Sequence, residues 1–333
     1  MTPPIIPGLV STIIPVYNRA AMLREAVDSV LAQSWPQIEI LICDDGSTDE
    51  TVALGQQLSA ADPRITYLWN PNRGAGSARE AGRQRARGEF IQYLDSDDTL
   101  WPHKFERQIA ALRAQPHCGA AYGWIRLCPE DGPPATSAHK WSGRPIPTLF
   151  PHLLVDRWWN TNVPLWRRSV TDRIGPWSSL RYSQDWEYDA RAGALGIQLA
   201  YVPEFVSDQR HHGTARQTGH GRWLEPKDRV QFFSALFRAA CQAGVVAQSL
   251  ERRHFSRWMF AQARECALLG DEAAAASLFQ LSVEASAAAS ADRLLFRGGA
   301  QLIGWRRASA FGQVLRSVLN KRPGSHTLKQ SWM

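Results

Sequence analysis

The feature that most constrains this chain is a short acidic segment, residues 93–98, in which three aspartates closely follow a tyrosine and a leucine. Residues 88–92 before it are apolar and β-prone, which predicts a buried strand. Pro102 after it predicts the first turn of a helix. The three carboxylates therefore gather at the carboxyl end of a strand, which is where open α/β sheets bind ligands.

Two interpretations of this acidic segment are open. In the first, Asp95 and Asp97 hold a divalent metal that also binds a diphosphate, because like charges so close together favour a bound cation. In the second, Asp97 or Asp98 caps the following helix and the other carboxylates are hydrated. The pattern Asp-x-Asp is too short to separate the two interpretations, so the rest of the chain must decide.

Strands and helices alternate before the acidic segment. The predicted strands are 9–18, 38–43, 65–69 and 88–92, and the predicted helices run from about 22 to 34, from about 49 to 59 and from 77 to about 87. This order predicts an α/β fold, with a mostly parallel sheet, right-handed crossovers and helices on both faces. Asp44 and Asp45 follow the second strand, so they and residues 15–18 should share one rim of the sheet with the acidic segment.

Beyond the acidic segment the pattern continues and then changes. We expect a helix over 102–114, a strand over 120–125, a loop over 129–148 that folds over the site, and a late strand over 201–206. From residue 225 onward the apolar spacing predicts amphipathic helices, among them 258–269 and 272–290. The sequence therefore predicts an α/β domain over residues 1–224 and an α-helical region over residues 225–333.

Composition limits where and how such a chain works. The chain has 333 residues, 44% of them hydrophobic, which suits one large domain with an appendage. Its five cysteines are scattered and odd in number, which predicts reduced thiols in a reducing compartment. The N-terminus lacks the pattern of a secretory signal, and no apolar run is long enough to span a membrane. We therefore expect a cytoplasmic protein.

Five short segments together carry a specific resemblance. They are residues 12–18 (TIIPVYN), 31–34 (LAQS), 43–49 (CDDGSTD), 76–79 (GSAR) and 94–98 (LDSDD). In order and spacing, over roughly residues 9–215, they resemble the family-2 glycosyltransferases, which have the GT-A fold. The resemblance implies transfer of a sugar from a nucleotide-sugar donor, with inversion at the anomeric carbon. It also implies a divalent metal, Mg²⁺ or Mn²⁺, at the Asp-x-Asp motif.

The resemblance assigns roles to the rim residues. Asp45 would accept a hydrogen bond from the nucleobase, which favours a UDP-sugar although guanine and thymine also fit. Pro15 and Tyr17 would flank the base, and Arg79 near a helix N-terminus suits a diphosphate. The resemblance further implies that Asp95 and Ser96 contact the nucleotide. Asp97 would ligate the metal directly, and Asp95 would also contact it. His212, or its neighbour His211, would contact the metal or the diphosphate.

Asp185 is the candidate general base. An inverting displacement needs a carboxylate that takes the proton of the acceptor hydroxyl, and the family has a Glu-Asp pair at this place. Gln184 replaces the Glu here, so Asp185 alone remains. Glu187 and Asp189 are the alternatives if the base lies elsewhere.

Tryptophans are concentrated in residues 151–190, and indole faces suit sugar rings. We expect Trp158 and Trp159 to be the exposed pair that contacts the sugar or acceptor, with Trp186 as a third contact. For Trp166 and Trp177 we expect burial in the core.

The last 43 residues, 291–333, hold eight basic residues and one acidic residue, which equals the whole net charge of +7. Phe311, Val314, Leu315, Val318 and Leu319 form a helical apolar stripe in this tail. The tail could therefore lie on an anionic membrane surface, where a lipid-linked acceptor would be found, or pack on the helical region.

The predicted function is metal-dependent inverting glycosyl transfer to a glycan or lipid-linked acceptor, in the biosynthesis of a cell-surface polysaccharide or glycoconjugate. No nucleic-acid partner is expected. A nucleotidyltransferase and a non-catalytic sugar-binding relative are the alternatives. The first would need a Gly-rich basic loop after the first strand, and the second would have lost Asp45, Asp95, Asp97 and Asp185.

Overall fold

The computed structural model describes residues 4–180, 182–211, 225–286 and 291–310. The chain divides into two compact units, residues 1–222 with 238–245 and residues 223–237 with 246–333. The division expected between residues 224 and 225 stays a prediction.

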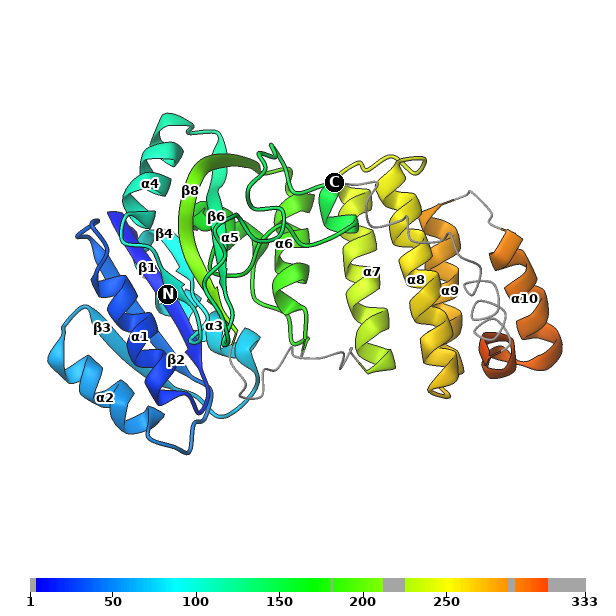
Figure 1. The fold of residues 1–333 in the computed structure, drawn as a ribbon, viewed down its shortest axis with the longest axis horizontal. Coiled ribbons are helices and arrows are strands. Elements are labelled where there is room, and N and C mark those ends of the chain that lie inside the picture. The colour runs from blue at the N-terminus through cyan, green and yellow to red at the C-terminus, as the bar shows by residue number, and fades with distance from the viewer. Residues whose placement is uncertain (1–3, 181, 212–224, 287–290, 311–333) are drawn as a thin grey trace. The chain divides into compact units, whose positions relative to one another are not determined.

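The first unit is built on one mixed eight-stranded sheet (Figure 1). In spatial order its strands are β3 (Ile65–Trp69), β2 (Ile38–Asp44), β1 (Ile6–Val16), β4 (Gly88–Tyr93), β7 (Leu165–Arg167), β6 (Cys118–Cys128), β8 (Gln198–Arg210) and β5 (Thr99–Leu100). The first four strands are parallel, as the alternation of strands and helices predicts. β7 runs antiparallel to both of its neighbours, and β5 runs antiparallel to β8.

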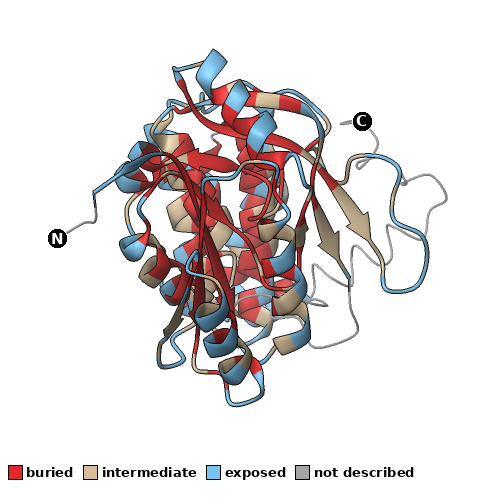
Figure 2. Ribbon diagram, turned by 90° about the vertical axis from the view of Figure 1, so that its left-hand side faces the viewer, coloured by how far each residue is buried: buried red, intermediate tan, exposed pale blue. Residues whose placement is uncertain are grey.

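Helices cover both faces of the sheet, because successive residues of a strand point to opposite faces. On one face, α1 (Ala20–Leu31), α2 (Thr51–Ala61) and α4 (Lys104–Ala114) share a core with Val10 and Ile14 of β1. On the other face, α3 (Ala75–Arg85) packs closely on Ile13 of β1 and Cys43 of β2 at Gly82. Figure 2 shows the central strands buried between these layers.

The acidic segment does not cap a helix. The two-residue strand β5 follows it directly, and α4 begins only at Lys104 with His103 at its N-cap. Asp98 instead accepts hydrogen bonds from Asn162 Nδ2 and the Arg210 backbone N–H, both at 3.0 Å, so it links β4 to β8. The capping interpretation is therefore wrong.

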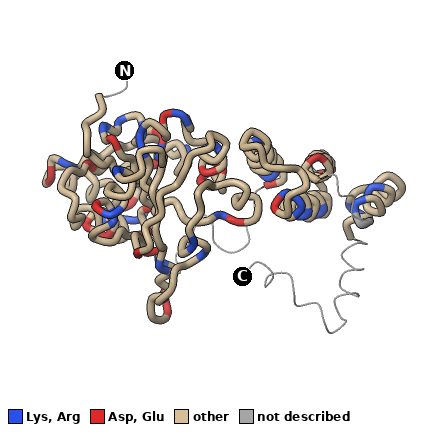
Figure 3. The backbone as a smooth tube through the Cα atoms, turned by 90° about the horizontal axis from the view of Figure 1, so that it is seen from above, with Lys and Arg blue, Asp and Glu red and all other residues tan. Residues whose placement is uncertain are grey.

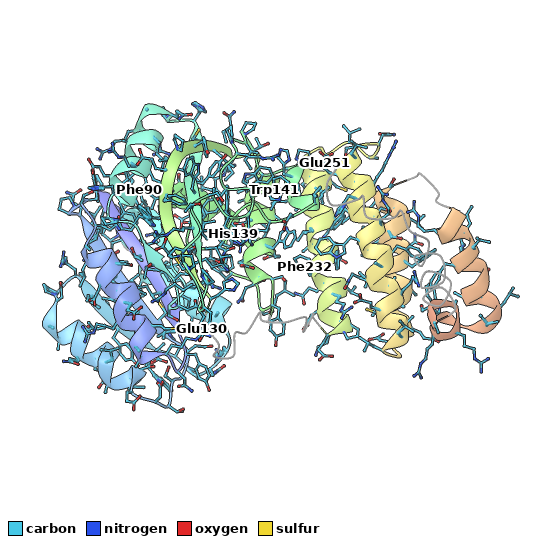
Figure 4. The ribbon with its side chains drawn as sticks, in the orientation of Figure 1. Phe90, Glu130, His139, Trp141, Phe232 and Glu251 are labelled. Carbon is cyan, nitrogen blue, oxygen red and sulfur yellow. The ribbon has the colours of Figure 1, made fainter. Side chains whose placement is uncertain are left out.

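The rest of the first unit contains the 3₁₀ turn η1 (His152–Leu154), α5 (Arg168–Ile174) and α6 (Gln184–Ala194). Residues 129–148 form an irregular loop, as predicted, and two of its backbone N–H groups, of Ala135 and His139, donate to β6 carbonyls at 2.8 Å. Figure 4 labels Glu130, His139 and Trp141 along this loop. All five cysteines are free thiols.

The second unit is helical, as predicted. Its helices, with α7 shared between the two units, are α7 (Pro226–Gln242), α8 (Leu250–Leu268), α9 (Glu272–Ala285) and α10 (Ala291–Ile303). α8 and α9 form a hairpin at Gly270, whose φ of +89° suits glycine, and Asp271 caps α9 by accepting from the Ala274 N–H. The apolar stripe over residues 311–319 lies outside the described residues. Within the described ranges, no helix is both long and apolar enough to cross a membrane.

Candidate active site

A cavity of about 940 Å³ opens at the carboxyl ends of β1, β2 and β4. Most of the predicted site residues line it, namely Pro15, Tyr17, Asp45, Arg79, Asp95, Ser96, Asp97, Asp185 and Trp186. Pro15 lies at the end of β1, the other residues before Asp185 except Arg79 closely follow β1, β2 or β4, α3 supplies Arg79, and α6 supplies the last two. The structure thus brings residues that are up to 171 positions apart into one space.

Two arginines neutralise the Asp-x-Asp carboxylates. Arg79 Nη2 pairs with Asp95 Oδ1 at 2.5 Å, and Arg19 Nη1 pairs with Asp97 Oδ2 at 2.6 Å. Arg19 was not among the predicted site residues, although its position directly after the Pro-x-Tyr-Asn strand end places it on the same rim.

Arg79 has hydrogen-bonding capacity left for an anion. It is 5% exposed, and its Nε and Nη1 have no hydrogen-bond partner among the described residues. Its guanidinium lies 4.7 Å from the centre of the Trp177 ring, which holds it in place. Because α3 begins at Ala75, its helix N-terminus adds a second positive contribution near this group. This arrangement can bind a diphosphate.

Asp45 orders the loop before α3. Its two carboxylate oxygens accept the backbone N–H groups of Arg73 and Gly74, both at 2.8 Å. Burial raises the pKa of this carboxyl, while those two hydrogen bonds act in the opposite direction. A carboxylate has about four acceptor positions, so Asp45 can still accept from a base N–H. Tyr17 is 40% exposed beside it on the cavity wall.

The donor set at the end of β4 suits a hard cation. Asp95 and Asp97 offer only carboxylate oxygens, which Mg²⁺ and Mn²⁺ prefer. Among the residues that the structure describes, no three His, Cys, Asp or Glu side chains form a metal site by themselves. A cation would therefore take one or two of these carboxylates together with oxygens of the substrate. His212 lies outside the described residues, and its role stays a prediction, as does the choice between it and His211.

Asp185 lies in the first turn of α6, and its side chain is 30% exposed. Arg157 Nη1 forms an ion pair with Asp185 Oδ2, and Oδ1 accepts the Trp186 backbone N–H at 2.9 Å. Burial alone would raise the pKa of Asp185, but Arg157 and then Arg79 outweigh it and the pKa is lowered. The group is thus an ionised carboxylate that faces the cavity, as a general base requires.

The two alternative bases are placed differently. Glu187 pairs with Arg191, one turn along α6, at 2.7 Å. Asp189 is 4% exposed and pairs with Arg157 at 2.8 Å, and burial raises its pKa to about 6 although Arg157 lowers it. Neither belongs to the residues that line the cavity, which favours Asp185.

The expectation of an exposed tryptophan pair is wrong. Trp158 is 8% exposed and stacks on Trp141, with ring centres 5.6 Å apart. Trp159 is fully buried against Tyr122. Burial of so much apolar area stabilises the fold, which explains why both indoles face inward. Trp186 does line the cavity, with its Nε1 donating to the Leu153 carbonyl at 3.1 Å.

Trp166 and Trp177 are buried, as expected. Trp166 lies on the short strand β7, and Trp177 stacks on Tyr188 of α6 with ring centres 4.2 Å apart. Through this stack Trp177 supports the wall of the cavity that carries Arg79.

Comparison with known proteins decides the family. The family model described as glycosyl transferase family 2 matches residues 11–187, which is more than half of the chain and includes the cavity residues from Pro15 to Asp185. The chain belongs to glycosyl transferase family 2.

Curated relatives match over limited segments. An uncharacterized glycosyltransferase of Rickettsia prowazekii is 47% identical over 104 residues, which are 31% of this chain and 32% of that protein. A chondroitin synthase of Escherichia coli is 35% identical over 133 residues, 40% of this chain and 19% of that protein. The matched segment thus spans a third or less of each of these relatives.

Solved structures match over nearly the whole chain. Residues 1–349 of Staphylococcus aureus TarS, in complex with UDP-GlcNAc, superpose with a TM-score of 0.72 at 14% identity, over 93% of this chain and 92% of that one. The mannosyltransferase PcManGT of Pyrobaculum calidifontis, in complex with GDP-Man and Mn²⁺, gives a TM-score of 0.51 at 18% identity, over 97% of this chain and 90% of that one. These similarities show the predicted GT-A fold with a C-terminal helical region.

Proposed function

We propose that this chain transfers a sugar from a nucleotide-diphosphate sugar to a hydroxyl group of an acceptor, with inversion at the anomeric carbon. One observation carries the proposal. A single cavity is lined by an ionised carboxylate, Asp185, by Arg79, two nitrogen atoms of which have no hydrogen-bond partner among the described residues, and by the acidic pair Asp95 and Asp97. Family membership and the retained acids disfavour the nucleotidyltransferase and the non-catalytic alternatives.

The chemistry follows from these groups. Asp185 takes the proton of the acceptor hydroxyl while the acceptor oxygen forms a bond to the anomeric carbon. The bond from that carbon to the diphosphate oxygen breaks, and the leaving nucleoside diphosphate keeps the electron pair. Arg79 and the N-terminus of α3 stabilise the charge that grows there. A divalent cation held by Asp97 and Asp95 would add Lewis-acid stabilisation of the same leaving group.

The donor is proposed to be a UDP-sugar. Asp45 can accept from the imide N–H of uracil, Pro15 and Tyr17 line the cavity where they would flank the base, and Ser96 lines it beside Asp95. The ligands named for the two structural neighbours, UDP-GlcNAc and GDP-Man with Mn²⁺, support a nucleotide-diphosphate sugar and a divalent metal. The chondroitin synthase relatives support a role in polysaccharide or glycoconjugate biosynthesis.

We also propose that the protein acts in the cytoplasm, at an anionic membrane surface that presents the acceptor. Residues 293–310 contain four arginines and no acidic residue. Arg293 is buried and donates to Ser256 and Ser282, whereas Arg297, Arg306 and Arg307 are exposed; Figure 3 shows basic residues in this part of the chain. On α10, Leu294, Leu295 and Leu302 are 63%, 75% and 86% exposed. Exposed leucines beside arginines are typical of a helix that binds the membrane interface.

The function is tested with a panel of UDP-, GDP- and dTDP-sugars, by measuring slow donor hydrolysis with Mg²⁺ or Mn²⁺ and with EDTA. We expect turnover of UDP-sugars that requires the cation and is lost in Asp97→Ala, because Asp97 would ligate the metal. Release of pyrophosphate from a nucleoside triphosphate and a sugar phosphate would instead support a nucleotidyltransferase. Full turnover in excess EDTA would overturn the metal requirement.

A further inference from the structure

Arg157 connects the cavity to a buried acid. Asp185 and Asp189 are four residues apart on α6, so they lie on the same face of that helix. Arg157, from the segment between η1 and β7, contacts both: its Nη1 pairs with Asp185, and its Nε donates to Asp189 Oδ2 at 2.8 Å. The side chains of Arg157 and Asp189 are 8% and 4% exposed, whereas that of Asp185 is 30% exposed. Of these three groups, Asp185 is the one that opens substantially to solvent.

We propose that Arg157 is a positioning residue, which fixes the direction of the Asp185 carboxylate toward the cavity and is itself fixed by Asp189. The planar guanidinium can hold two carboxylates at once in a defined geometry, which an ammonium group on a flexible stem cannot do. Thr161 adds a further contact, 3.4 Å from Asp185 Oδ2. The inference rests on the proposed function, because it concerns the proposed general base.

The charges around Asp185 give the proposal a measurable consequence. The cations that face Asp185 are Arg157 from the segment before β7, Arg79 from α3 and Lys140 from the loop after β6, and together they lower its pKa against burial. The negative charge nearest to Arg157 besides Asp185 is Asp189 on α6. Burial raises the pKa of Asp185, and Arg157 is the strongest of the charges that lower it. Without Arg157, the pKa of Asp185 should therefore rise.

Two variants separate positioning from packing. Arg157→Lys keeps the positive charge but removes the planar guanidinium that contacts both carboxylates. The double variant Arg157→Gln/Asp189→Asn removes the cation together with the buried carboxylate that pairs with it, so that no unpaired Asp189 remains. Arg191→Gln is the matched control, because it breaks the other four-residue ion pair of α6, with Glu187, away from the cavity lining. Circular dichroism establishes that each variant folds.

The first readout does not depend on turnover. With ¹³C-labelled aspartate, the carboxyl resonance of Asp185 is assigned by its loss in Asp185→Asn and followed against pH. We expect its pKa to rise in the double variant, because the lost Arg157 contacts Asp185 directly; the loss of the Asp189 charge acts in the opposite direction, so the rise should be about one unit at most. In Arg191→Gln it should stay at the wild-type value. Since no donor is present, this result stands even if no nucleotide sugar is turned over.

The second readout separates binding from catalysis. For the donor that the panel turns over fastest, kcat of Arg157→Lys should fall by about 10- to 100-fold, because a misdirected base loses near-attack geometry. Its affinity for UDP should stay within about threefold of wild type. An unchanged titration in the double variant together with wild-type kcat in Arg157→Lys would make Arg157 a packing residue. A parallel loss of UDP affinity would make it a donor contact and overturn the proposal.

Discussion

Three carboxylates of the cavity each pair with an arginine from another part of the chain. Asp95, Asp97 and Asp185 meet partners that are 16, 78 and 28 positions away. The acids themselves could be predicted, because they directly follow a predicted strand or match a family motif. The place of Arg19 on the rim could also be predicted, but its pairing with Asp97 and that of Arg157 with Asp185 could not, since a pairing across such separations depends on the tertiary fold and has no local pattern. The same limit explains Trp158 and Trp159, whose burial depends on neighbours that come from other segments.

At Asp185, replacement by asparagine conserves shape and removes the proton acceptor. We expect kcat of Asp185→Asn to fall by about 10²- to 10⁴-fold, the usual contribution of a general base, with little change in UDP affinity. Steady-state kinetics and calorimetry measure the two quantities. Glu187→Gln is the control, because Glu187 is on the same helix and pairs with Arg191. A kcat of Asp185→Asn within a few-fold of wild type would place the base elsewhere.

At Arg79, the two nitrogen atoms without a hydrogen-bond partner in the described part of the chain predict a contact specific to the diphosphate. Arg79→Gln should weaken UDP binding by about 10- to 100-fold, because a hydrogen bond to a charged group contributes about 1.5–3 kcal/mol. Uridine lacks the diphosphate, so its affinity should change little. Calorimetric titration of both ligands into both proteins measures this difference. Equal losses for UDP and uridine would show that Arg79 shapes the cavity and does not bind phosphate.

At the scale of elements, alternating strands and helices made the parallel half of the sheet predictable. β7 and β5 were missed, because strands of three and two residues are too short to show a period of two. They are defined by their pairing with longer strands. The helix expected from Pro102 begins at Lys104, so Pro102 precedes α4 and is not in its first turn. The ends of α8 and α9 also shifted, since apolar spacing locates the middle of a helix better than its boundaries.

The contact between α3 and the sheet depends on Gly82. A β-carbon at position 82 would lie 2.5 Å from Ile13 Cγ2 and 2.7 Å from Cys43 Sγ. Gly82→Val should therefore lower the free energy of unfolding of the first unit by about 1–3 kcal/mol, the usual cost of overpacking. Gly298→Ala on α10 is the control, because nothing lies within 4 Å of that position and alanine favours a helix. Urea unfolding followed by circular dichroism measures both, and an undiminished stability of Gly82→Val would contradict the close packing.

At the scale of the whole molecule, charge and chemistry are separated along the sequence. The family model ends at residue 187, and residues 1–290 have no net charge, whereas residues 291–333 hold the whole excess of +7. The residues proposed to act in catalysis all belong to the first unit, and they do not explain the positive charge of residues 291–333. Within the described part of that segment, α10 buries Phe296 and Ala300 and exposes leucines on the opposite side. A helix that turns apolar residues both inward and outward is typical of one with a second partner.

An anionic membrane is the partner that this combination of leucine and arginine fits. The full chain should co-sediment with vesicles of phosphatidylcholine and phosphatidylglycerol, less with phosphatidylcholine alone, and less as salt increases. Leu295→Gln/Leu302→Gln should weaken binding to the anionic vesicles through loss of apolar contact. Arg306→Gln/Arg307→Gln should weaken it by about 30-fold, at about 1 kcal/mol for each basic residue near the surface. Both pairs of residues are exposed, so these variants should fold.

Leu269→Gln is the matched control for the leucine variant, because Leu269 is 65% exposed at the end of α8 in the same unit. It should bind the vesicles as the wild type does, since it belongs neither to α10 nor to the basic segment. Equal binding of all four proteins, or no binding at low salt, would leave α10 as a surface for protein contact. Weaker vesicle binding by the arginine variant, with unchanged binding by the leucine variant, would show that charge alone attracts the chain and that α10 does not enter the membrane interface.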